Sequence, residues 1–326
     1  MHIDLWYCIK KMSRRVFMDI EQFKKQIKKT RTSTMPKPKA LVEEALQNSP
    51  YYQEEQSYFL SNATEVLYGI REACWFTYLK HEKDFNIKMG ESLVTQDQDI
   101  QNNQSHDAAE IIGSFLEKYS DHLFELSKSN TNSRRSRAGK EFEAIIEVIL
   151  LRAGIFFDNQ GIIGSTLFET ERLGKLVDCV VPGVIEYGLE RRKCSLISMK
   201  TSLRERWQEV PEEMKRTGAQ EMFLLTLDKG VTRNTIESLA SHNITLVVPD
   251  DVKLQHYEEY LSVYGLTKFL YELIERNQAW IKRIDLPKSY YQSKLDTVLS
   301  RLKDISDPYE REVFEGLKSF CLEKLK

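Results

Sequence analysis

The chain has 326 residues, 41% of them hydrophobic and 10% aromatic, which is enough for one large domain or two smaller domains with hydrophobic cores. Lysine and arginine total 47 against 49 acidic residues, and the formal net charge of -2 excludes a uniformly basic surface, so any contact with nucleic acid must use local clusters of positive charge. The cysteines form no Cys-x-x-Cys pair, and the sequence has neither a membrane-spanning apolar run nor a secretion signal; it therefore argues against a disulfide framework and predicts a cytoplasmic protein without membrane contact.

Residues 1–130 are predicted to form a helical domain. Apolar side chains recur every three or four positions in residues 59–80 and again in residues 108–126, which is typical of amphipathic helices. Residues 94–107 between them are polar and lack aromatic side chains, so we expect a loop there.

A basic segment, residues 24–39, precedes these helices. Pro36 and Pro38 are expected to keep it extended. Two interpretations have equal weight: an arm that contacts a phosphate backbone, or a solvated basic tail.

The polar, arginine-rich segment 127–140 marks the expected boundary between the helical domain, 1–130, and a second domain, 131–326. A helix is predicted over residues 141–155, directly behind this boundary. Strand-like runs follow at residues 175–183, 194–200, 222–227 and 244–250, and helical runs at 232–242, 259–284 and 309–325. This order predicts an α/β (α+β) core with a mixed sheet, followed by C-terminal helices.

Asp178 and Lys200 are the pair from which a chemistry can be argued. Ser198 shares one strand face with Lys200, and Asp178 lies in the preceding strand-like run, which a Pro-Gly pair turns back. Two neighbouring strands can therefore bring Asp178 and Lys200 together at one edge of the sheet. In metal-dependent phosphodiesterases such an acid holds a divalent cation, and the lysine positions a water or balances charge in the transition state.

A second acid is expected two residues before the lysine, where this chain has Ser198, which cannot replace a carboxylate as a metal ligand. Pro211 favours the start of a new helix, with Glu212 and Glu213 in its first turn. A glutamate from this helix can fill the space above Ser198, and we assign Glu213 to that role.

Asp178, the Ser-Met-Lys run that ends at Lys200, and the glutamate at position 213 resemble the type II restriction endonucleases of the PD-(D/E)XK superfamily. More narrowly, the chain resembles the CCGG branch, which includes EcoRII, BsaWI and PfoI and in which the second acid has moved to the following helix. The runs KTSLRERW, which begins at Lys200, and SRAGKEFE, which ends at Glu143, are similar to motifs of this branch.

The resemblance implies a Mg2+-dependent DNA endonuclease in which Asp178 and Glu213 bind the metal and Lys200 is the catalytic cation. It also implies that Glu143 supports a second metal site; the alternative is a solvated helix glutamate.

Arg204, Glu205 and Arg206 follow the lysine directly and are predicted to read DNA bases. Arginine can bond O6 and N7 of guanine, and a glutamate can accept from N4 of cytosine, so the triplet suits a CC:GG step. In the CCGG branch, which this chain resembles, the base-reading residues occupy this position. The alternative is a surface charge cluster that stabilises little. Phosphate contacts are predicted for basic residues at the domain junction, namely Arg134, Arg135, Arg137 and Lys140.

The combined prediction is an endonuclease that cuts both strands of a palindrome with CC/GG half-sites. Because a symmetric double-strand cut needs two active sites, at least a homodimer is implied. Two other functions suit the same core: a DNA-binding protein that does not cleave, and a repair nuclease that recognises DNA structure.

Overall fold

The structure is a computed structural model that describes residues 18–326 except 96, 102–106, 164–167, 169, 172, 174–176, 205 and 218. At positions 98, 99, 162, 163, 206, 213 and 216 it describes the backbone without the side chain. The chain divides into two compact units. The first comprises Met1–Leu41 and Cys74–Arg137, and the second comprises Val42–Ala73 and Ala138–Lys326. Among the described residues, no helix combines the length and the apolar composition needed to cross a membrane.

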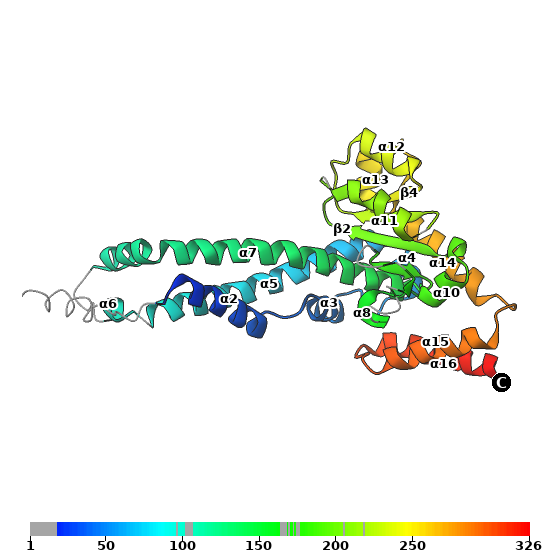
Figure 1. Ribbon diagram of the computed structural model, residues 1–326, viewed down its shortest axis with the longest axis horizontal. Coiled ribbons are helices and arrows are strands. Elements are labelled where there is room, and N and C mark those ends of the chain that lie inside the picture. The colour runs from blue at the N-terminus through cyan, green and yellow to red at the C-terminus, as the bar shows by residue number, and fades with distance from the viewer. Residues whose placement is uncertain are drawn as a thin grey trace, which may run out of the picture. The chain divides into compact units, whose positions relative to one another are not determined.

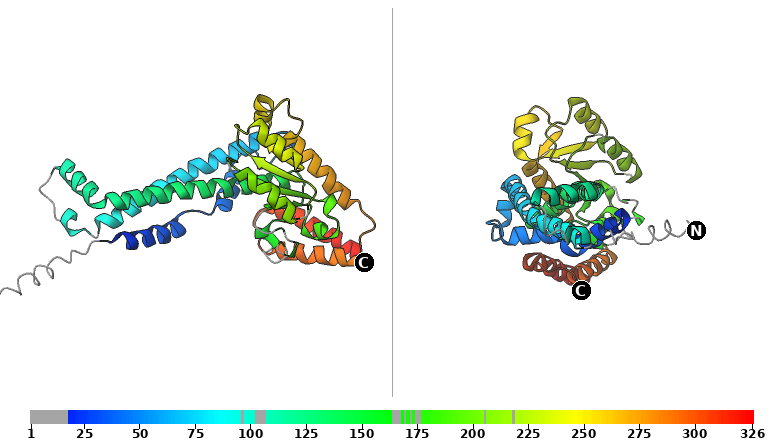
Figure 2. Two further views of the ribbon diagram at one scale, coloured as in Figure 1. Left: turned by 45° about the horizontal axis from the view of Figure 1, so that its top comes forward. Right: turned by 90° about the vertical axis from the view of Figure 1, so that its left-hand side faces the viewer.

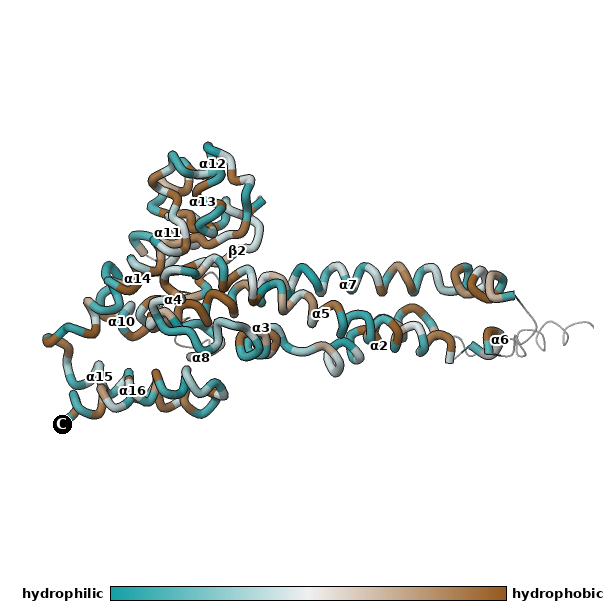
Figure 3. Tube along the Cα trace, turned by 180° about the vertical axis from the view of Figure 1, so that it is seen from behind, coloured by the Kyte–Doolittle hydropathy of each residue, from teal (hydrophilic) through white to brown (hydrophobic). Residues whose placement is uncertain are grey.

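The first unit is helical. It contains α2 (Ile20–Thr34), the later part of α5 (Ala63–Val94), α6 (Gln98–Gln101) and the earlier part of α7 (Ala108–Arg152). In this unit α2, α5 and α7 run side by side (Figure 1), and Phe23, Phe85 and Tyr119 join them in one hydrophobic cluster. Hydrophilic and hydrophobic residues alternate along α2 and α7 (Figure 3), as expected of helices that bury one face.

The prediction of an extended basic arm over residues 24–39 is wrong, because most of this segment belongs to helix α2. Asp19 caps the helix by accepting a hydrogen bond from the Gln22 backbone N–H at 2.8 Å. Phe23 and Ile27 lie one turn apart and form the buried apolar face of this helix. The prolines act after the helix: Pro38 begins α3 (Pro38–Gln47), where its missing N–H removes no helical hydrogen bond.

The segment 127–140, predicted as a domain boundary, lies inside the continuous helix α7. The two compact units divide between Arg137 and Ala138, and residues 42–73 belong to the second unit. Arginine and lysine are good helix formers, so a polar composition alone does not interrupt a helix.

The second unit is built on a five-stranded sheet in the order β1-β2-β3-β4-β5. The strands are β1 (Cys179–Val181), β2 (Ser195–Lys200), β3 (Met222–Thr226), β4 (Ile244–Val248) and β5 (Val263–Gly265). Strand β1 pairs antiparallel with β2, and the remaining neighbours pair parallel. The predicted mixed sheet is thus confirmed.

Both faces of the sheet are covered by helices. The helices of this unit include α4 (Gln56–Ser61), α8 (Gln160–Ile163), α10 (Val184–Leu189), α11 (Glu209–Thr217), α12 (Arg233–Ser241), α13 (Asp250–His256) and α14 (Leu266–Ile281). Leu224 of β3 packs in a cluster with Ile236 of α12. Its neighbour Phe223 points to the other face and meets Phe269 of α14, with ring centroids 5.0 Å apart. Figure 2 shows α14, in orange, alongside the strands.

Residues 259–284 do not form the single helix that was predicted. Strand β5 pairs parallel with β4, and α14 begins only at Leu266. Gly265 joins the two elements, and a Cβ at this position would collide with the carboxylate of Asp250. A strand as short as β5 has too few residues to show an alternating pattern.

Two further helices, α15 (Lys288–Leu302) and α16 (Pro308–Leu325), end the chain and pack side by side (Figure 1). Asp307 caps α16 by accepting a hydrogen bond from the Glu310 N–H at 2.9 Å. The described cysteines, Cys74, Cys179, Cys194 and Cys321, are buried thiols.

Candidate active site

Asp178 and Lys200 lie together where β1 begins and β2 ends. The backbone N–H of Asp178 donates to the Ile197 carbonyl at 2.9 Å, which aligns the residue with β2. One carboxylate oxygen, Oδ2, accepts from the Met199 N–H at 2.6 Å and lies 3.9 Å from the Lys200 Nζ. The antiparallel register of β1 and β2 therefore sets this pair, since Cys179 is opposite Ile197.

The pair is largely shielded from water, with the Lys200 side chain 18% and the Asp178 side chain 19% exposed. Burial raises the pKa of Asp178 above its ordinary value, and this is opposed by the Lys200 charge and the Met199 N–H. A cation beside the Asp178 carboxylate would therefore be favoured, because it stabilises the ionised form that burial disfavours.

Glu143 on α7 is the second carboxyl group of the site. Burial raises its pKa to about 7, and the negative charges of Asp178 and Glu147 act in the same direction, whereas Lys200 and Lys140 lower it. Asp178, Lys200 and Glu143 are thus close enough to influence one another. A carboxyl group that titrates near neutral pH beside a second carboxylate can help to bind a cation, or it can accept a proton.

Glu147, one turn after Glu143, was not singled out from the sequence. It accepts a hydrogen bond from the Asn159 Nδ2 at 2.5 Å, and its charge acts on Glu143. The i,i+4 spacing of two glutamates on a helix with an otherwise apolar buried face was the signal available.

We expect Glu143→Gln to raise the stability of the metal-free protein at pH 8. The pKa of Glu143 rises from an ordinary 4.5 to about 7 on folding. The folded state therefore binds this proton more tightly, and wild-type stability falls as pH rises from 4.5 through 7. Solvent screens the partly exposed group, so we expect a gain of about 1–2 kcal/mol above pH 7.

The measurement is denaturant unfolding in a chelator at pH 4 and pH 8. The two proteins should have similar free energies of unfolding at pH 4, where the carboxyl is protonated in both states. An equal difference at both pH values would show that Glu143 is not the titrating group.

Ser198 occupies the strand position at which a second acid is expected. Its side chain is fully buried, and its Oγ makes no hydrogen bond to the described residues. Continuing the β1–β2 register by one residue places it opposite Asp178.

Helix α11 begins at Glu209, two residues before the predicted start at Pro211. Proline is tolerated there because the N–H groups of the first turn have no helical partner. Glu213 lies in this helix, but its side chain lies outside the described residues.

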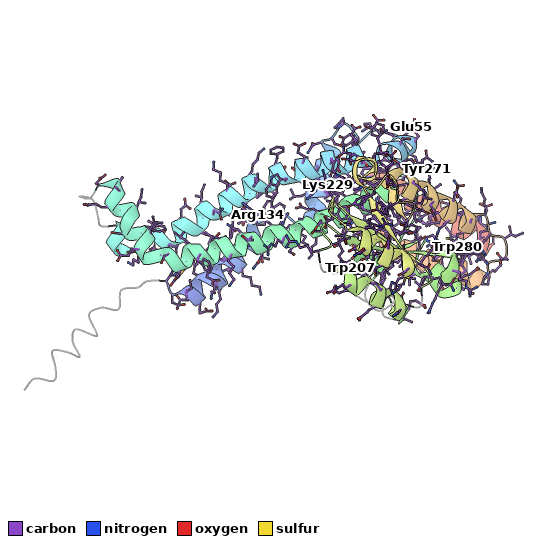
Figure 4. The ribbon with its side chains drawn as sticks, turned by 90° about the horizontal axis from the view of Figure 1, so that it is seen from above. Glu55, Arg134, Trp207, Lys229, Tyr271 and Trp280 are labelled. Carbon is purple, nitrogen blue, oxygen red and sulfur yellow. The ribbon has the colours of Figure 1, made fainter. Side chains whose placement is uncertain are left out.

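The segment after β2 is anchored on either side of Arg204. Leu203 is buried, and its N–H donates to the Asp228 Oδ2 at 3.2 Å. Arg204 is exposed and has a left-handed backbone with φ 40°, a conformation that costs energy for a residue with a side chain. Trp207 packs against the sheet's hydrophobic cluster and is labelled in Figure 4.

The other two predicted base-reading residues are incompletely described. Glu205 lies outside the described residues, and Arg206 has a described backbone at the start of the short helix η3 (Arg206–Gln208). The sequence does not reveal Asp228 as the anchor of Leu203, because Asp228 follows β3, Leu203 follows β2, and no sequence pattern links the two positions.

The four basic residues that are predicted to contact phosphate differ in their surroundings. Arg134, labelled in Figure 4, bonds Glu82 through its Nε at 3.0 Å, and Arg137 donates to the Pro36 carbonyl at 2.7 Å. Arg135 and Lys140 are exposed and form no ion pair with the described residues.

Among the side chains that the structure describes, no group of three His, Cys, Asp or Glu is placed to hold a metal ion. Two carboxyl groups with raised pKa values, Asp178 and Glu143, nevertheless lie near each other, and their excess negative charge suits a divalent cation. Oxygen ligands of this kind are those that Mg2+ prefers.

Known proteins similar to this chain are restriction enzymes. The family model of the EcoRII C terminal matches residues 102–270. The type II restriction enzyme SsoII of Shigella sonnei is 38% identical over 289 residues, which cover 88% of this chain and 93% of SsoII. The type II restriction enzyme EcoRII of Escherichia coli is 25% identical over 144 residues, 42% of this chain and 33% of EcoRII.

A solved structure of metal-depleted Ecl18kI in complex with uncleaved, modified DNA has a TM-score of 0.85 and 36% identity and covers 93% of this chain and 99% of that one. The fold is that of the PD-(D/E)XK restriction endonucleases. The chain belongs to the EcoRII family of type II restriction endonucleases.

Proposed function

We propose that the protein hydrolyses both strands of double-stranded DNA at a palindrome with CC/GG half-sites, in the cytoplasm, as a Mg2+-dependent homodimer. The observation that carries this proposal is the shielded Asp178–Lys200 pair, 3.9 Å between Oδ2 and Nζ, with Glu143 beside it. The dimer follows from the chemistry, since cutting both strands symmetrically requires two such sites.

Asp178 and Glu213 would hold Mg2+, and Glu143 would support a second ion. When bound, Mg2+ neutralises charge on the scissile phosphate and lowers the pKa of a water. Asp178 is kept oriented by the Met199 N–H. Lys200 donates a hydrogen bond to the attacking water or to a phosphate oxygen and balances the charge that develops. Glu143, with a pKa of about 7, can exchange a proton near neutral pH.

Base recognition is assigned to Arg204, Glu205 and Arg206. The buried Leu203 and its hydrogen bond to Asp228 support this role, because they fix the backbone next to the exposed Arg204. The bases outside the CC:GG step would have to be read elsewhere.

We expect Arg206→Ala to lose about 1–3 kcal/mol of discrimination against substitution of the guanine it contacts. The measurement is a competition between the cognate duplex and duplexes altered at single positions. Arg192→Ala serves as the control, because Arg192 is an exposed arginine of the same unit that precedes β2 and lies outside the recognition segment. Unchanged discrimination in Arg206→Ala would remove this residue from the base-reading set.

A groove of about 350 Å³ in the first unit supports DNA contact by the helical part of the chain. Its basic lining residues are Lys24, Lys28 and Arg31 of α2 and Lys128 of α7. Arg31 donates to the Asn130 Oδ1 at 2.5 Å, which ties α2 to α7. The acidic residue of the lining is Glu125, 3.8 Å from the Lys128 Nζ, so a positive excess remains for a backbone phosphate.

We expect Lys28→Gln/Lys128→Gln to weaken binding to cognate and unrelated duplexes alike. The plot of log affinity against log salt should become shallower by about 1–2, because each neutralised phosphate contributes about 0.9 to the slope. The control is Lys88→Gln, an exposed lysine of the same unit outside the groove. A slope equal to that of the wild type would show that the groove does not contact DNA.

Plasmid digestion with and without Mg2+ tests the proposed function. Discrete fragments that require the metal support it, and sequencing their ends gives the recognition site. An intact plasmid with a gel shift would indicate a DNA-binding protein, and a smear without fixed fragments would indicate a structure-specific nuclease.

A further inference from the structure

Three charged side chains meet in the interior of the second unit, and the proposed reaction does not use them. They are Lys294 of α15, Glu186 of α10 and Asp158, which precedes α8, with 6%, 1% and 4% of their surfaces exposed. Buried charges are costly, and an apolar cluster of equal volume often gives the same or greater stability. These three residues therefore need not add to stability, and their directional contacts can instead fix the positions of the elements that carry them.

Lys294 and Glu186 form the ionic part of this cluster. The Lys294 Nζ lies 2.9 Å from the Glu186 Oε1 and 3.1 Å from Oε2. The Tyr290 hydroxyl, one turn before Lys294, donates to the Glu186 Oε1 at 2.7 Å. Helix α15 is thereby bonded to α10, the helix that directly follows strand β1.

Asp158 connects the cluster to the outer edge of β1. Its N–H donates to the Val180 carbonyl at 2.9 Å, and its carbonyl accepts from the Val180 N–H at 2.8 Å. Its carboxylate accepts from the Val184 N–H at 2.9 Å and so caps the first turn of α10. The Lys294 charge acts on this carboxylate.

Gly183, between β1 and α10, marks the point where the groups converge. A Cβ at this position would lie 2.6 Å from the Glu186 Oε2 and 3.0 Å from the Lys294 Nζ, and it would collide with the Asp158 carboxylate. Only a residue without a side chain leaves room for the three charged groups at the end of β1.

Strand β1 is three residues long, and Asp178 directly precedes it. One edge of β1 pairs with β2, and Asp158 holds the other edge at Val180. The position of the Asp178 carboxylate beside the Met199 N–H therefore depends on both edges.

We propose that Lys294, Glu186 and Asp158 are positioning residues that hold β1 in register and thereby place Asp178 for metal binding. Helix α15 supplies the cation of this triad. The metal-binding part of the inference rests on the proposed function, whereas the placement of Asp178 can be tested without cleavage.

Lys294→Met removes the cation at similar length and leaves Glu186 and Asp158 in place. Amide hydrogen exchange should then be at least about tenfold faster at Val180 and Met199, because the hydrogen bonds on both edges of β1 loosen. Lys294→Arg, which keeps the charge, should restore most of the protection. Leu295→Ala, in the next position of α15 and also buried, is the control for a general loss of stability.

Wild-type protection at Val180 and Met199 in folded Lys294→Met would overturn the proposal, as would an equal loss of protection in Leu295→Ala. If Lys294→Met does not fold, Tyr290→Phe removes a single hydrogen bond to Glu186 and should accelerate exchange at the same two amides to a smaller extent. No acceleration in Tyr290→Phe would then overturn it.

Cleavage supplies the second measurement. The Mg2+ concentration for half-maximal cleavage should rise about 10–100-fold in Lys294→Met, since residues behind metal ligands commonly have effects of this size. Binding of cognate DNA without metal should be unchanged. A wild-type protein that never cleaves DNA would refute the proposed function, while the exchange experiment would still decide whether the cluster positions Asp178.

Discussion

Lys200→Ala should lower the single-turnover rate of DNA cleavage by about 10²–10³-fold or more while leaving cognate binding within a few-fold of the wild type. The ammonium group lies 3.9 Å from the Asp178 carboxylate and is 18% exposed, so its charge acts in a site with little screening by water. A charge of this kind stabilises the transition state, in which negative charge develops, more than the bound DNA. The rate should therefore fall much more than the affinity.

The measurement is a rate with enzyme in excess over a labelled cognate duplex at saturating Mg2+, paired with a binding titration without metal. Lys229→Ala is the matched control, because Lys229 is an exposed lysine of the same unit, labelled in Figure 4 and outside the site. A Lys200→Ala variant that cleaves within a few-fold of the wild type would exclude Lys200 from the chemistry.

Glu213→Gln should reduce the cleavage rate by about 100-fold or more at a fixed, moderate Mg2+ concentration. The amide keeps the shape of the side chain but removes the negative charge that a hard cation requires. Ser198, which occupies the expected strand position of the second acid, cannot supply that charge. Loss of one ligand weakens metal binding, so part of the activity should return as the Mg2+ concentration is raised.

Glu212→Gln is the control for this prediction, since Glu212 is the exposed neighbour of Glu213 on α11. It should cleave like the wild type and show the same Mg2+ dependence. If Glu212→Gln is inactive and Glu213→Gln is active, the acid of α11 has been misassigned by one position. If both variants cleave normally, the second ligand does not come from this helix.

The sequence predicted that Asp178 and Lys200 lie side by side because the relevant information is local. Asp178 directly precedes β1 and Lys200 ends β2, and antiparallel pairing brings the start of one strand beside the end of the other. The predicted Pro-Gly turn is only part of the connection, because α10 and the short helix η2 (Arg191–Lys193) lie between the two strands. Glu143 was assigned by resemblance, and the structure places it near enough to Asp178 and Lys200 for their charges to act on it, although burial is the main cause of its raised pKa. No local pattern could have located it there.

The errors also have physical causes. The prediction of an extended arm over residues 24–39 fails because Phe23 and Ile27, spaced one turn apart, pack α2 against the first unit's core, and the prolines come only after the helix. The prediction of a single helix over residues 259–284 fails because β5 forms by pairing with β4, a tertiary effect that overrides local preference.

The buried cluster at Lys294 could not be found from the sequence at all. Lysine, glutamate and aspartate are common on surfaces, and nothing in their spacing distinguishes Lys294, Glu186 and Asp158 from solvated residues. Only the fold shows that they share one interior site at the end of β1.

A crystal structure of the Lys200→Ala variant with a cognate duplex and Mg2+ would test the central claim most directly, because the substrate should remain uncut. We predict an ion bound by carboxylate oxygens of both Asp178 and Glu213 at about 2.0–2.1 Å and in contact with the scissile phosphate. An ion held at that phosphate by other residues, with the Asp178 carboxylate turned away from it, would contradict the account.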